Sequence, residues 1–225
     1  MKIAVQVPIK GKSSIRVPNK NFRNLNGKPL CYWVLDELVK LPADIDIFID
    51  SEEENIFQKL AIPRFQRFKF HKRKKWFSHD QANGNHLIHQ FALDHLEYDA
   101  YAQIYVTAVT LKEQIITNAL EAFRKNSSKH DSLFLATEET GWVWFKDEPI
   151  NYDPLRPHGL PRSQDATFIK ETTGLYAIMR EAVLLSGCRI GSSPYVFKIE
   201  PEYAMDIDTM SDFIEAEKLL SLQNI

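Results

Sequence analysis

Six lysine and arginine side chains gather in the segment that follows the first apolar run of the chain. The run MKIAVQ is followed by VPIKGKSSIRVPNKNFRNLNGKPL, residues 7–30, which contains no acidic residue. Its basic residues are Lys10, Lys12, Arg16, Lys20, Arg23 and Lys28. The backbone amide of Gly11 and the hydroxyls of Ser13 and Ser14 would add hydrogen-bond donors to this positive charge. Such a combination is typical of a loop that binds a phosphate-containing anion.

Two other interpretations of this loop make different demands on the sequence. A Walker A phosphate-binding loop ends like the tripeptide GKS at 11–13, but it needs a glycine five residues before Gly11, where the chain has Gln6. It also needs a helix at this point, and Pro18 follows too closely for a regular one. The remaining alternative is a solvated surface loop whose lysines keep the protein in solution.

Two carboxylates with a spacing of two residues stand near the carboxyl end, in Asp206-Ile207-Asp208. In an extended segment such residues point to the same side with Cα atoms roughly 6.6 Å apart, so both can bind one Mg²⁺. Thr209 and Ser211 are suited to cap the terminal helix, which predicts a strand-to-helix junction here. The sequence Asp44-Ile45-Asp46 has the same spacing, but we expect it at the solvent-facing start of a strand.

A second basic segment, HKRKKWFSHDQANGN at 71–85, also follows a predicted strand. Seven Lys or Arg residues fall between Arg64 and Lys75, and phenylalanines alternate with them. A nucleic-acid track with stacking rings would use such a pattern, but the period of two favours phenylalanines that face the core. We assign Arg73 to phosphate binding, because a mononucleotide satisfies both basic loops. The nearby histidines have no cysteine close in sequence, so a zinc site is not expected.

Apolar runs alternate with helical stretches along the chain. This alternation is typical of an α/β fold with a mostly parallel twisted sheet flanked by helices. Strands are predicted at 2–7, 45–50, 67–72, 102–108, 132–137, 174–179 and 195–199. Helices are predicted at 29–41, 53–60, 85–96, 113–125 and 211–222. In such sheets ligands bind beyond the carboxyl ends of the strands, where both basic loops are expected.

One stretch departs from the alternation. The sequence DEPINYDPLRPHGLPRSQD, at 147–165, contains four prolines and cannot form a regular helix or a central strand. We expect a single domain spanning 1–225 with an excursion roughly at 139–170, which serves as an arm, a lid or a subunit contact. Trp142 and Trp144 would place two rings on one face of a strand there, which suits a subunit contact.

The composition excludes several classes of protein. Hydrophobic residues make up 44% and charged residues 26%, which is ordinary for a globular protein, and the formal net charge of -2 argues against nucleic-acid binding through overall charge. No stretch approaches the roughly 20 apolar residues that cross a bilayer, and the amino-terminal apolar run is too short for a signal peptide. The two cysteines, Cys31 and Cys188, indicate a reducing compartment. We therefore expect a cytoplasmic protein without a membrane partner.

Six segments, in order, resemble the acylneuraminate cytidylyltransferases, or CMP-sialate synthetases. The opening PIKGKSSIRVPNKNFRNLNGKPL is similar to their first motif, P-x-[RK]-x-x-S-x-R-x-P-x-K-N, and its continuation N-G-K-P-L. The other five are RKKWFSHDQANGN, QIYVTAV, LPRSQD, ETTGLYAI and AMDIDTMSDFIEAEKLL. The closing double aspartate and the R-x-P-x-K-N spacing are closer to the nonulosonate branch than to the CMP-Kdo synthetases. The resemblance implies a Rossmann-like nucleotidyltransferase fold with a Pro-rich dimerisation arm, and a homodimer.

The resemblance also implies a reaction. CTP and a 2-keto-3-deoxy sugar acid, which is sialic, legionaminic, pseudaminic or Kdo-like, would give a CMP-sugar and pyrophosphate. The implied catalytic residues beside the triphosphate are Lys20, Lys10 and Arg16. The residues implied to bind the nucleotide are Ser13, Asn21, Arg73, Ala82 and Gly84. Those implied to bind the sugar acid are Tyr105, Thr107, Arg162 and Gln164, and Asp206 and Asp208 would hold Mg²⁺.

The chain departs from the family pattern at several positions. One extra residue lies between Lys10 and Arg16, Lys10 replaces the commoner arginine, and Ala108-Val109 stands where Ser-Pro is usual. Two other classes therefore stay open. One is a metal-dependent DxD glycosyltransferase, which would place its DxD in the middle of the chain, and the other is a non-catalytic nucleotide-binding relative. The sequence does not name the sugar acid.

Overall fold

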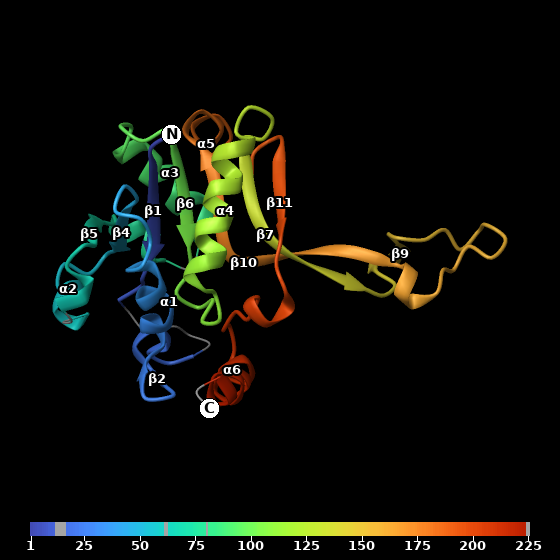
Figure 1. The fold of residues 1–225 in the computed structure, drawn as a ribbon, viewed down its shortest axis with the longest axis horizontal. Coiled ribbons are helices and arrows are strands. Elements are labelled where there is room, and N and C mark those ends of the chain that lie inside the picture. Colours follow the sequence, from blue (N-terminus) through green and yellow to red (C-terminus); the bar gives the residue numbers. More distant parts are fainter. Residues whose placement is uncertain (12–16, 61–62, 80, 224–225) are drawn as a thin grey trace.

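The computed structural model describes residues 1–11, 17–60, 63–79 and 81–223. These residues form a seven-stranded sheet in the order β11-β7-β10-β6-β1-β4-β5 (Figure 1). Its strands are β1 (Ile3–Pro8), β4 (Asp46–Ser51), β5 (Lys69–Lys72), β6 (Ala100–Ile104), β7 (Ser132–Thr140), β10 (Thr167–Met179) and β11 (Pro194–Lys198). Every neighbouring pair is parallel except the two pairs that β10 makes, with β6 and β7. The predicted α/β fold with a mostly parallel sheet is confirmed.

Helices cover both faces of this sheet (Figure 1). The described α-helices are α1 (Leu30–Leu38), α2 (Ile56–Lys59), α3 (Gly84–Asp94), α4 (Glu113–Asn126), α5 (Arg180–Ser186) and α6 (Met210–Gln223), and the last of these lies beyond the end of the sheet. Val5 of β1 belongs to the core cluster that contains the apolar residues of α1 and α4, whereas its neighbour Ala4 packs with those of α3 and α5. Successive strand residues point to opposite faces, so β1 is buried on both sides and its continuous apolar run is explained.

Some predicted boundaries differ from the structure. The run at 102–108 is predicted as one strand, but β6 ends at Ile104, and a turn follows in which the amide of Ala108 donates to the carbonyl of Tyr105 at 3.2 Å. Tyr105 and Thr107 therefore lie on a loop beyond the strand. The sequence pattern also missed α5 and the short paired strands β2 (Asn24–Leu25) and β3 (Lys28–Pro29).

The alternating phenylalanines are divided between the core and an edge. Phe65 and Phe68 are buried, as the period-two pattern predicts, and their rings stack with centroids 5.4 Å apart. Phe70 is instead 36% exposed, because it lies on β5, the last strand of the sheet. The strand is also shorter than the predicted 67–72, since only Lys69–Lys72 pair with β4.

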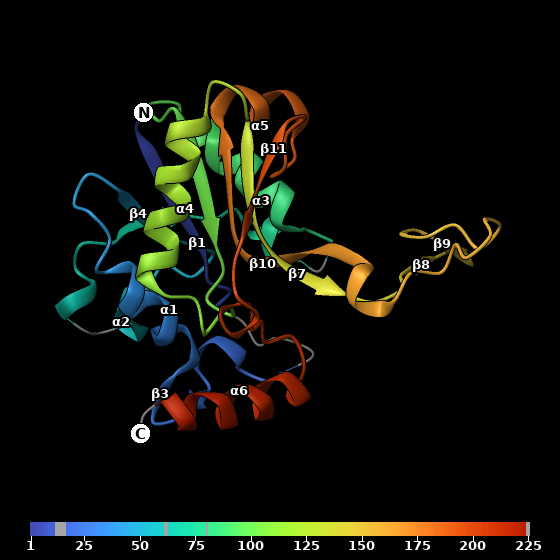
Figure 2. The same ribbon diagram turned by 45° about the vertical axis from the view of Figure 1, so that its right-hand side comes forward.

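The segment between β7 and β10 extends away from the body of the molecule (Figures 1 and 2). It contains the short strands β8 (Trp144–Phe145) and β9 (Glu148–Pro149). Trp142 precedes β8, and its indole Nε1 donates to the carbonyl of Pro161 at 3.0 Å. The sequence predicts both tryptophans on one strand, but only Trp144 lies on β8. Both side chains are exposed. We call residues 141–166 the arm.

A third apolar cluster joins the two ends of the chain. Leu25 and Leu30, near the amino end, pack with Ile207, Phe213 and Leu220 from the carboxyl end. Figure 2 shows α6 lying beside β3 in accordance with these contacts. The cluster brings the segment before α6 next to the loop after β1. Within the described ranges, no helix is both long and apolar enough to span a bilayer.

Candidate functional site

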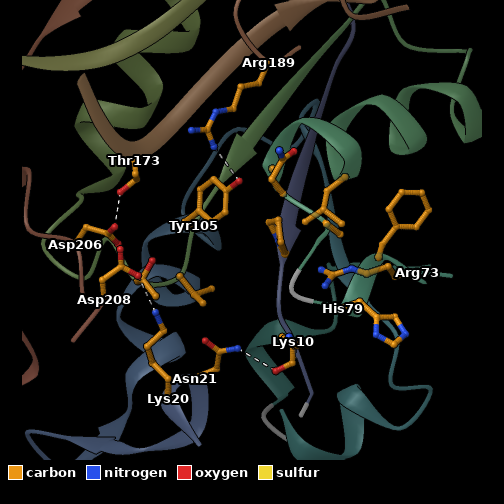
Figure 3. Close-up of a pocket in the computed structure, with 18 of the residues that line it drawn as sticks. Lys10, Lys20, Asn21, Arg73, His79, Tyr105, Thr173, Arg189, Asp206 and Asp208 are labelled. Carbon is orange, nitrogen blue, oxygen red and sulfur yellow. Dashed lines mark hydrogen bonds and ion pairs between the residues drawn. The ribbon is translucent and has the colours of Figure 1, made fainter. Parts of the chain in front are cut away.

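A pocket of about 640 Å³ opens beyond the carboxyl ends of β1 and β6 (Figure 3). Widely separated parts of the chain line it, among them the loop after β1, the first turn of α3, the turn after β6 and the segment before α6. Parallel α/β sheets place ligands at this edge, because the loops that follow adjacent strands diverge there. The location is the one that the sequence predicts for both basic loops.

Lys20 and the carboxylate pair meet in this pocket although 186 or more positions separate them in sequence. The Lys20 ammonium donates to the carbonyl of Ile207 at 2.7 Å, and its Nζ lies 3.4 Å from Oδ1 of Asp208 (Figure 3). The side chain of Lys20 is 13% exposed, whereas that of Asp208 is 49% exposed. The basic loop and the acidic segment thus form two walls of one site.

Asp206 has one carboxylate oxygen without a hydrogen-bond partner in the described part of the chain. Its Oδ2 accepts a hydrogen bond from the Thr173 hydroxyl at 2.5 Å (Figure 3). Its Oδ1 is buried and has no hydrogen-bond partner among the described residues. Burial of an unsatisfied carboxylate oxygen costs free energy, of order 1–3 kcal/mol or more. A cation that binds this oxygen would remove that cost.

The segment before α6 is held in place by its own cap. The backbone amides of Asp208 and Thr209 donate to Oδ2 of Asp212, at 2.9 and 2.7 Å, and the Asp212 amide donates back to the Thr209 hydroxyl at 3.3 Å. The predicted capping role of Thr209 is therefore present, and Asp212 takes the place expected of Ser211. The amide of Ile207 also donates to the carbonyl of Thr107 at 3.1 Å, which ties the pair to the turn after β6.

This geometry is compatible with Mg²⁺. The described residues contain no group of three or more His, Cys, Asp or Glu side chains that could hold a metal ion by themselves. Mg²⁺ is commonly bound by one or two carboxylates, with water and phosphate oxygens completing its octahedral shell. The buried oxygen of Asp206 and the exposed carboxylate of Asp208 match that donor set, and the adjacent open pocket leaves space for a phosphate.

Arg73 lines the pocket but is strongly paired. Its Nε donates to Oδ1 of Asp50 at 2.8 Å, its Nη2 donates to the Asp50 carbonyl at 2.7 Å, and its Nη1 lies 3.8 Å from a Glu52 oxygen. The Arg73 and Asp50 side chains are 5% and 2% exposed. Loss of one partner would leave a buried charge uncompensated, so the pair fixes the wall of the pocket. Its predicted contact with phosphate remains a prediction.

Two buried glutamines connect the central strands to the pocket. Gln103 of β6 donates from Nε2 to Oε1 of Gln6 at 2.8 Å and to the Gly84 carbonyl at 3.0 Å. The Tyr105 hydroxyl donates to Oε1 of Gln103 at 2.7 Å and accepts from Nη1 of Arg189 at 3.1 Å (Figure 3). Burial raises the pKa of Tyr105, against the opposing effect of Arg189, so the phenol is neutral at pH 7.

The first turn of α3 forms another wall, through Ala82, Asn83 and Gly84. A Cβ atom on Gly84 would lie 2.2 Å from the Tyr105 hydroxyl and 2.7 Å from Nη1 of Arg189. Glycine is therefore required here because two side chains occupy the space. The groups that approach Gly84 belong to the protein itself, and its predicted contact with the nucleotide remains a prediction.

Most of the predicted site residues line this single pocket. They are Lys10, Lys20, Asn21, Arg73, Ala82, Gly84, Tyr105, Thr107, Asp206 and Asp208. Asn21 also donates from Nδ2 to the carbonyl of Lys10 at 3.0 Å, which closes the basic loop on itself. Ser13 and Arg16 lie outside the described residues.

Arg162 and Gln164 do not line the pocket of their own chain. Both lie on the arm, which extends away from the sheet, and Nε of Arg162 donates to Asp165 at 2.7 Å. Within one chain they therefore lie apart from Tyr105 and Thr107, which do line the pocket. Their contact with the sugar acid remains a prediction.

Two residues that point into the pocket, Thr173 and Arg189, are not among those predicted from the sequence. Thr173 lies in the segment ETTGLYAI, where a hydroxyl beside the glycine was the available signal. Arg189 follows α5, a helix of Arg180–Ser186 that the pattern did not reveal, so no signal placed it near the site.

The chain matches known proteins over most of its length. The sequence profile of the family described as cytidylyltransferase matches residues 7–222. N-acylneuraminate cytidylyltransferase A of Danio rerio is 27% identical over 210 residues, which cover 90% of this chain and 47% of the relative. The pseudaminic acid cytidylyltransferase of Campylobacter jejuni strain 81-176 is 29% identical over 238 aligned positions, which cover 98% of this chain and 96% of the relative. The chain thus spans about half of the first protein and nearly all of the second.

Solved structures show the same fold. A CMP:2-keto-3-deoxy-manno-octonic acid synthetase complexed with CTP superposes with a TM-score of 0.70, at 15% identity, over 99% of this chain and 100% of the other. The 4-diphosphocytidyl-2C-methyl-D-erythritol synthase of Anaerococcus prevotii superposes with a TM-score of 0.66, at 10% identity, over 97% and 96%. With the family profile spanning nearly the whole chain, this protein belongs to the cytidylyltransferase family.

Proposed function

We propose that this chain transfers CMP from CTP to a 2-keto-3-deoxy sugar acid of the nonulosonic type and releases pyrophosphate. The observation that carries the proposal is the meeting of Lys20 with Asp206 and Asp208 in one pocket at the carboxyl edge of the sheet. The relatives named above support the choice of nucleotide and acceptor, since they are N-acylneuraminate and pseudaminic acid cytidylyltransferases.

The reaction needs positioning and charge neutralisation more than a covalent nucleophile. The anomeric hydroxyl oxygen of the sugar would form a bond to the α-phosphorus of CTP as the bond to the bridging oxygen of pyrophosphate breaks, the bonding electrons would leave with pyrophosphate, and the hydroxyl proton would pass to water. Lys20 and Lys10 would lie against the triphosphate and oppose the charge that develops on its oxygens. Asn21 would hold the Lys10 backbone in place through its hydrogen bond.

Asp206 and Asp208 would hold Mg²⁺, and the ion would supply further neutralisation of phosphate charge. Thr173 would orient Asp206 through its hydroxyl, so that the unpartnered Oδ1 faces the cation. The Lys20 ammonium, 3.4 Å from Oδ1 of Asp208, would stand beside the ion and the phosphate groups.

We further propose a homodimer in the cytoplasm. The arm carries large exposed apolar side chains, which are Trp142, Trp144, Phe145, Ile150, Leu155 and Leu160. A second copy that covers them would remove this surface from water. CTP is an intracellular nucleotide, and the free thiols of Cys31 and Cys188 suit the same compartment.

The test is pyrophosphate release from each of the four nucleoside triphosphates, with and without Mg²⁺, in the presence of N-acetylneuraminic, pseudaminic, legionaminic or Kdo acid. We expect release with CTP, Mg²⁺ and at least one of these acids only. CTP binding without release under any condition would favour the non-catalytic alternative. Consumption of a preformed nucleotide sugar would favour the glycosyltransferase, although the position of the DxD near the carboxyl end argues against that class.

A further inference from the structure

Arg189 enters the pocket from the loop between α5 and β11. In Figure 3 it lies above Tyr105, whereas Lys20 and the loop after β1 lie below it. The pocket therefore has a cationic group at each end. The lower end has the lysines that we assign to the triphosphate of CTP. The upper end has the guanidinium of Arg189, to which the proposed function gives no role.

The Arg189 side chain is fixed by its surroundings. Its backbone amide donates to Oδ1 of Asn85 in the first turn of α3 at 3.1 Å. Its guanidinium carbon lies 3.8 Å from the centre of the Tyr176 ring, and Nη1 donates to the Tyr105 hydroxyl at 3.1 Å. A planar cation stacked on a ring and hydrogen-bonded at one edge has little conformational freedom to lose when it binds a ligand.

The same guanidinium retains hydrogen-bonding capacity. Its only acidic neighbour among the described residues is Glu171, whose Oε1 lies 3.8 Å from Nη2, beyond hydrogen-bond distance. The side chain is 23% exposed. Arg73, the other arginine that lines the pocket within the described ranges, is 5% exposed and donates twice to Asp50. Of these two arginines, Arg189 is therefore the one with guanidinium N–H groups that can still donate to a ligand.

We propose that Arg189 binds the carboxylate of the sugar acid, an inference that rests on the proposed function. A guanidinium presents parallel N–H groups that match both oxygens of a carboxylate, which a lysine cannot do. Of the two anionic substrates, the triphosphate belongs with the lysines at the other end of the pocket. Arg162, the arginine that sequence analysis assigned to this carboxylate, lies on the arm outside the pocket of its own chain. Arg189 thereby selects acids over neutral sugars.

The test compares wild type with Arg189→Gln and Arg189→Lys, using N-acetylneuraminic and pseudaminic acids and their C1 methyl esters as acceptors. In Arg189→Gln, we expect KM for the acid to rise about 10- to 100-fold, the range for loss of a charge-assisted pair, with KM for CTP within about threefold. The wild-type preference for acid over ester, measured as kcat/KM, should fall by about tenfold or more. Arg189→Lys should lie between the two, because it keeps the charge and loses the fork.

The control is Arg124→Gln. Arg124 lies on α4, outside the pocket, where its side chain is 30% exposed and forms an ion pair with Asp44. The substitution should leave every constant unchanged. Equal losses for acid and ester in Arg189→Gln, or a rise in KM for CTP alone, would overturn the assignment even if wild type is active. A wild-type protein that releases no pyrophosphate with any acid would instead overturn the proposed function and this inference with it. Circular dichroism separates these results from a failure to fold, and Arg189→Lys keeps the test open if Arg189→Gln is unfolded.

Discussion

At the scale of single residues, the site contains a carboxylate, Asp206, that its described neighbours do not fully satisfy. Asp206 has one oxygen held by Thr173 and one buried oxygen without a partner among the described residues. The Asp208 side chain is 49% exposed, and its Oδ1 lies 3.4 Å from the Lys20 ammonium. Such an arrangement is costly without a ligand and favourable with a cation, which is why we place Mg²⁺ here.

Asp208→Asn should lower kcat by about 100-fold or more, because it removes a negative charge that would bind the cation. The fold should stay intact, because the side chain is 49% exposed and makes no core contact. The change is measured as pyrophosphate release at saturating CTP, together with Tm, which should move by less than about 3 °C. Asp44→Asn is the matched control, because Asp44 belongs to the other Asp-Ile-Asp sequence of the chain and is exposed at the surface. Wild-type rates in Asp208→Asn would refute the metal assignment.

A buried histidine should make stability depend on pH. Burial lowers the pKa of His71 below its ordinary 6.5, with smaller effects from Asp50 and His95. The unfolded chain then takes up a proton at a higher pH than the folded chain does. The free energy of unfolding should therefore be highest above about pH 7 and fall as the pH drops below the unfolded value of 6.5.

Urea unfolding at pH 8 to about pH 5.5 measures this slope in wild type and His71→Gln. The variant should have a shallower decrease, and His158→Gln, which removes an exposed histidine of the arm, should keep the wild-type slope. Parallel slopes in wild type and His71→Gln would show that another group titrates.

At the scale of elements, α3 connects stability to the site. Its N-cap Asn83 accepts hydrogen bonds from the amides of Asn85 and His86 at 3.0 and 3.2 Å, and the Asn83 amide donates to Nδ1 of His86 at 3.2 Å. The capped turn also holds Gly84 against Tyr105 and anchors the Arg189 backbone through Asn85. Loosening of this turn would therefore disturb the pocket as well as the helix.

Asn83→Ala should lower the free energy of unfolding by about 1 kcal/mol, because two amides of the first turn lose their acceptor. Urea unfolding is the measurement. Asn118→Ala, on the exposed surface of α4, should change the free energy by less than about 0.5 kcal/mol. Equal effects of the two substitutions would mean that the capping hydrogen bonds contribute little to stability.

At the scale of the whole molecule, the arm is a projection with apolar side chains that the rest of the chain does not cover (Figures 1 and 2). Trp144 and Phe145 are 57% and 62% exposed. A projection of this kind gains stability when a second copy packs against it.

The double substitution Trp144→Ser with Phe145→Ser should convert a dimer into a monomer in sedimentation velocity at micromolar concentration. Leu185→Ser is the control, because Leu185 is 91% exposed on α5, away from the arm, and should leave the dimer intact. A wild-type protein that sediments as a monomer would contradict the proposed subunit contact.

The sequence by itself determined the order of the seven strands of the main sheet and of every described α-helix except α5, because apolar period and turn residues are local properties. It also determined the chemistry of two walls of the pocket, since Lys10, Lys20, Asp206 and Asp208 carry that chemistry in their own side chains. Its strand over 102–108 was too long, because the turn at Tyr105 depends on a hydrogen bond that apolar pattern does not encode.

Only the tertiary structure decided which of these residues meet. Lys20 reaches Asp208 because Leu25 and Leu30 pack against α6. These residues are far apart in the sequence, so no local pattern predicts the contact. Arg189 lies in the pocket because a short unpredicted helix, α5, returns the chain to α3. Arg162 lies outside it because the paired strands β7 and β10 run past their neighbours before the arm begins. Side-chain type sets what a residue can do, but packing between distant segments sets what it touches.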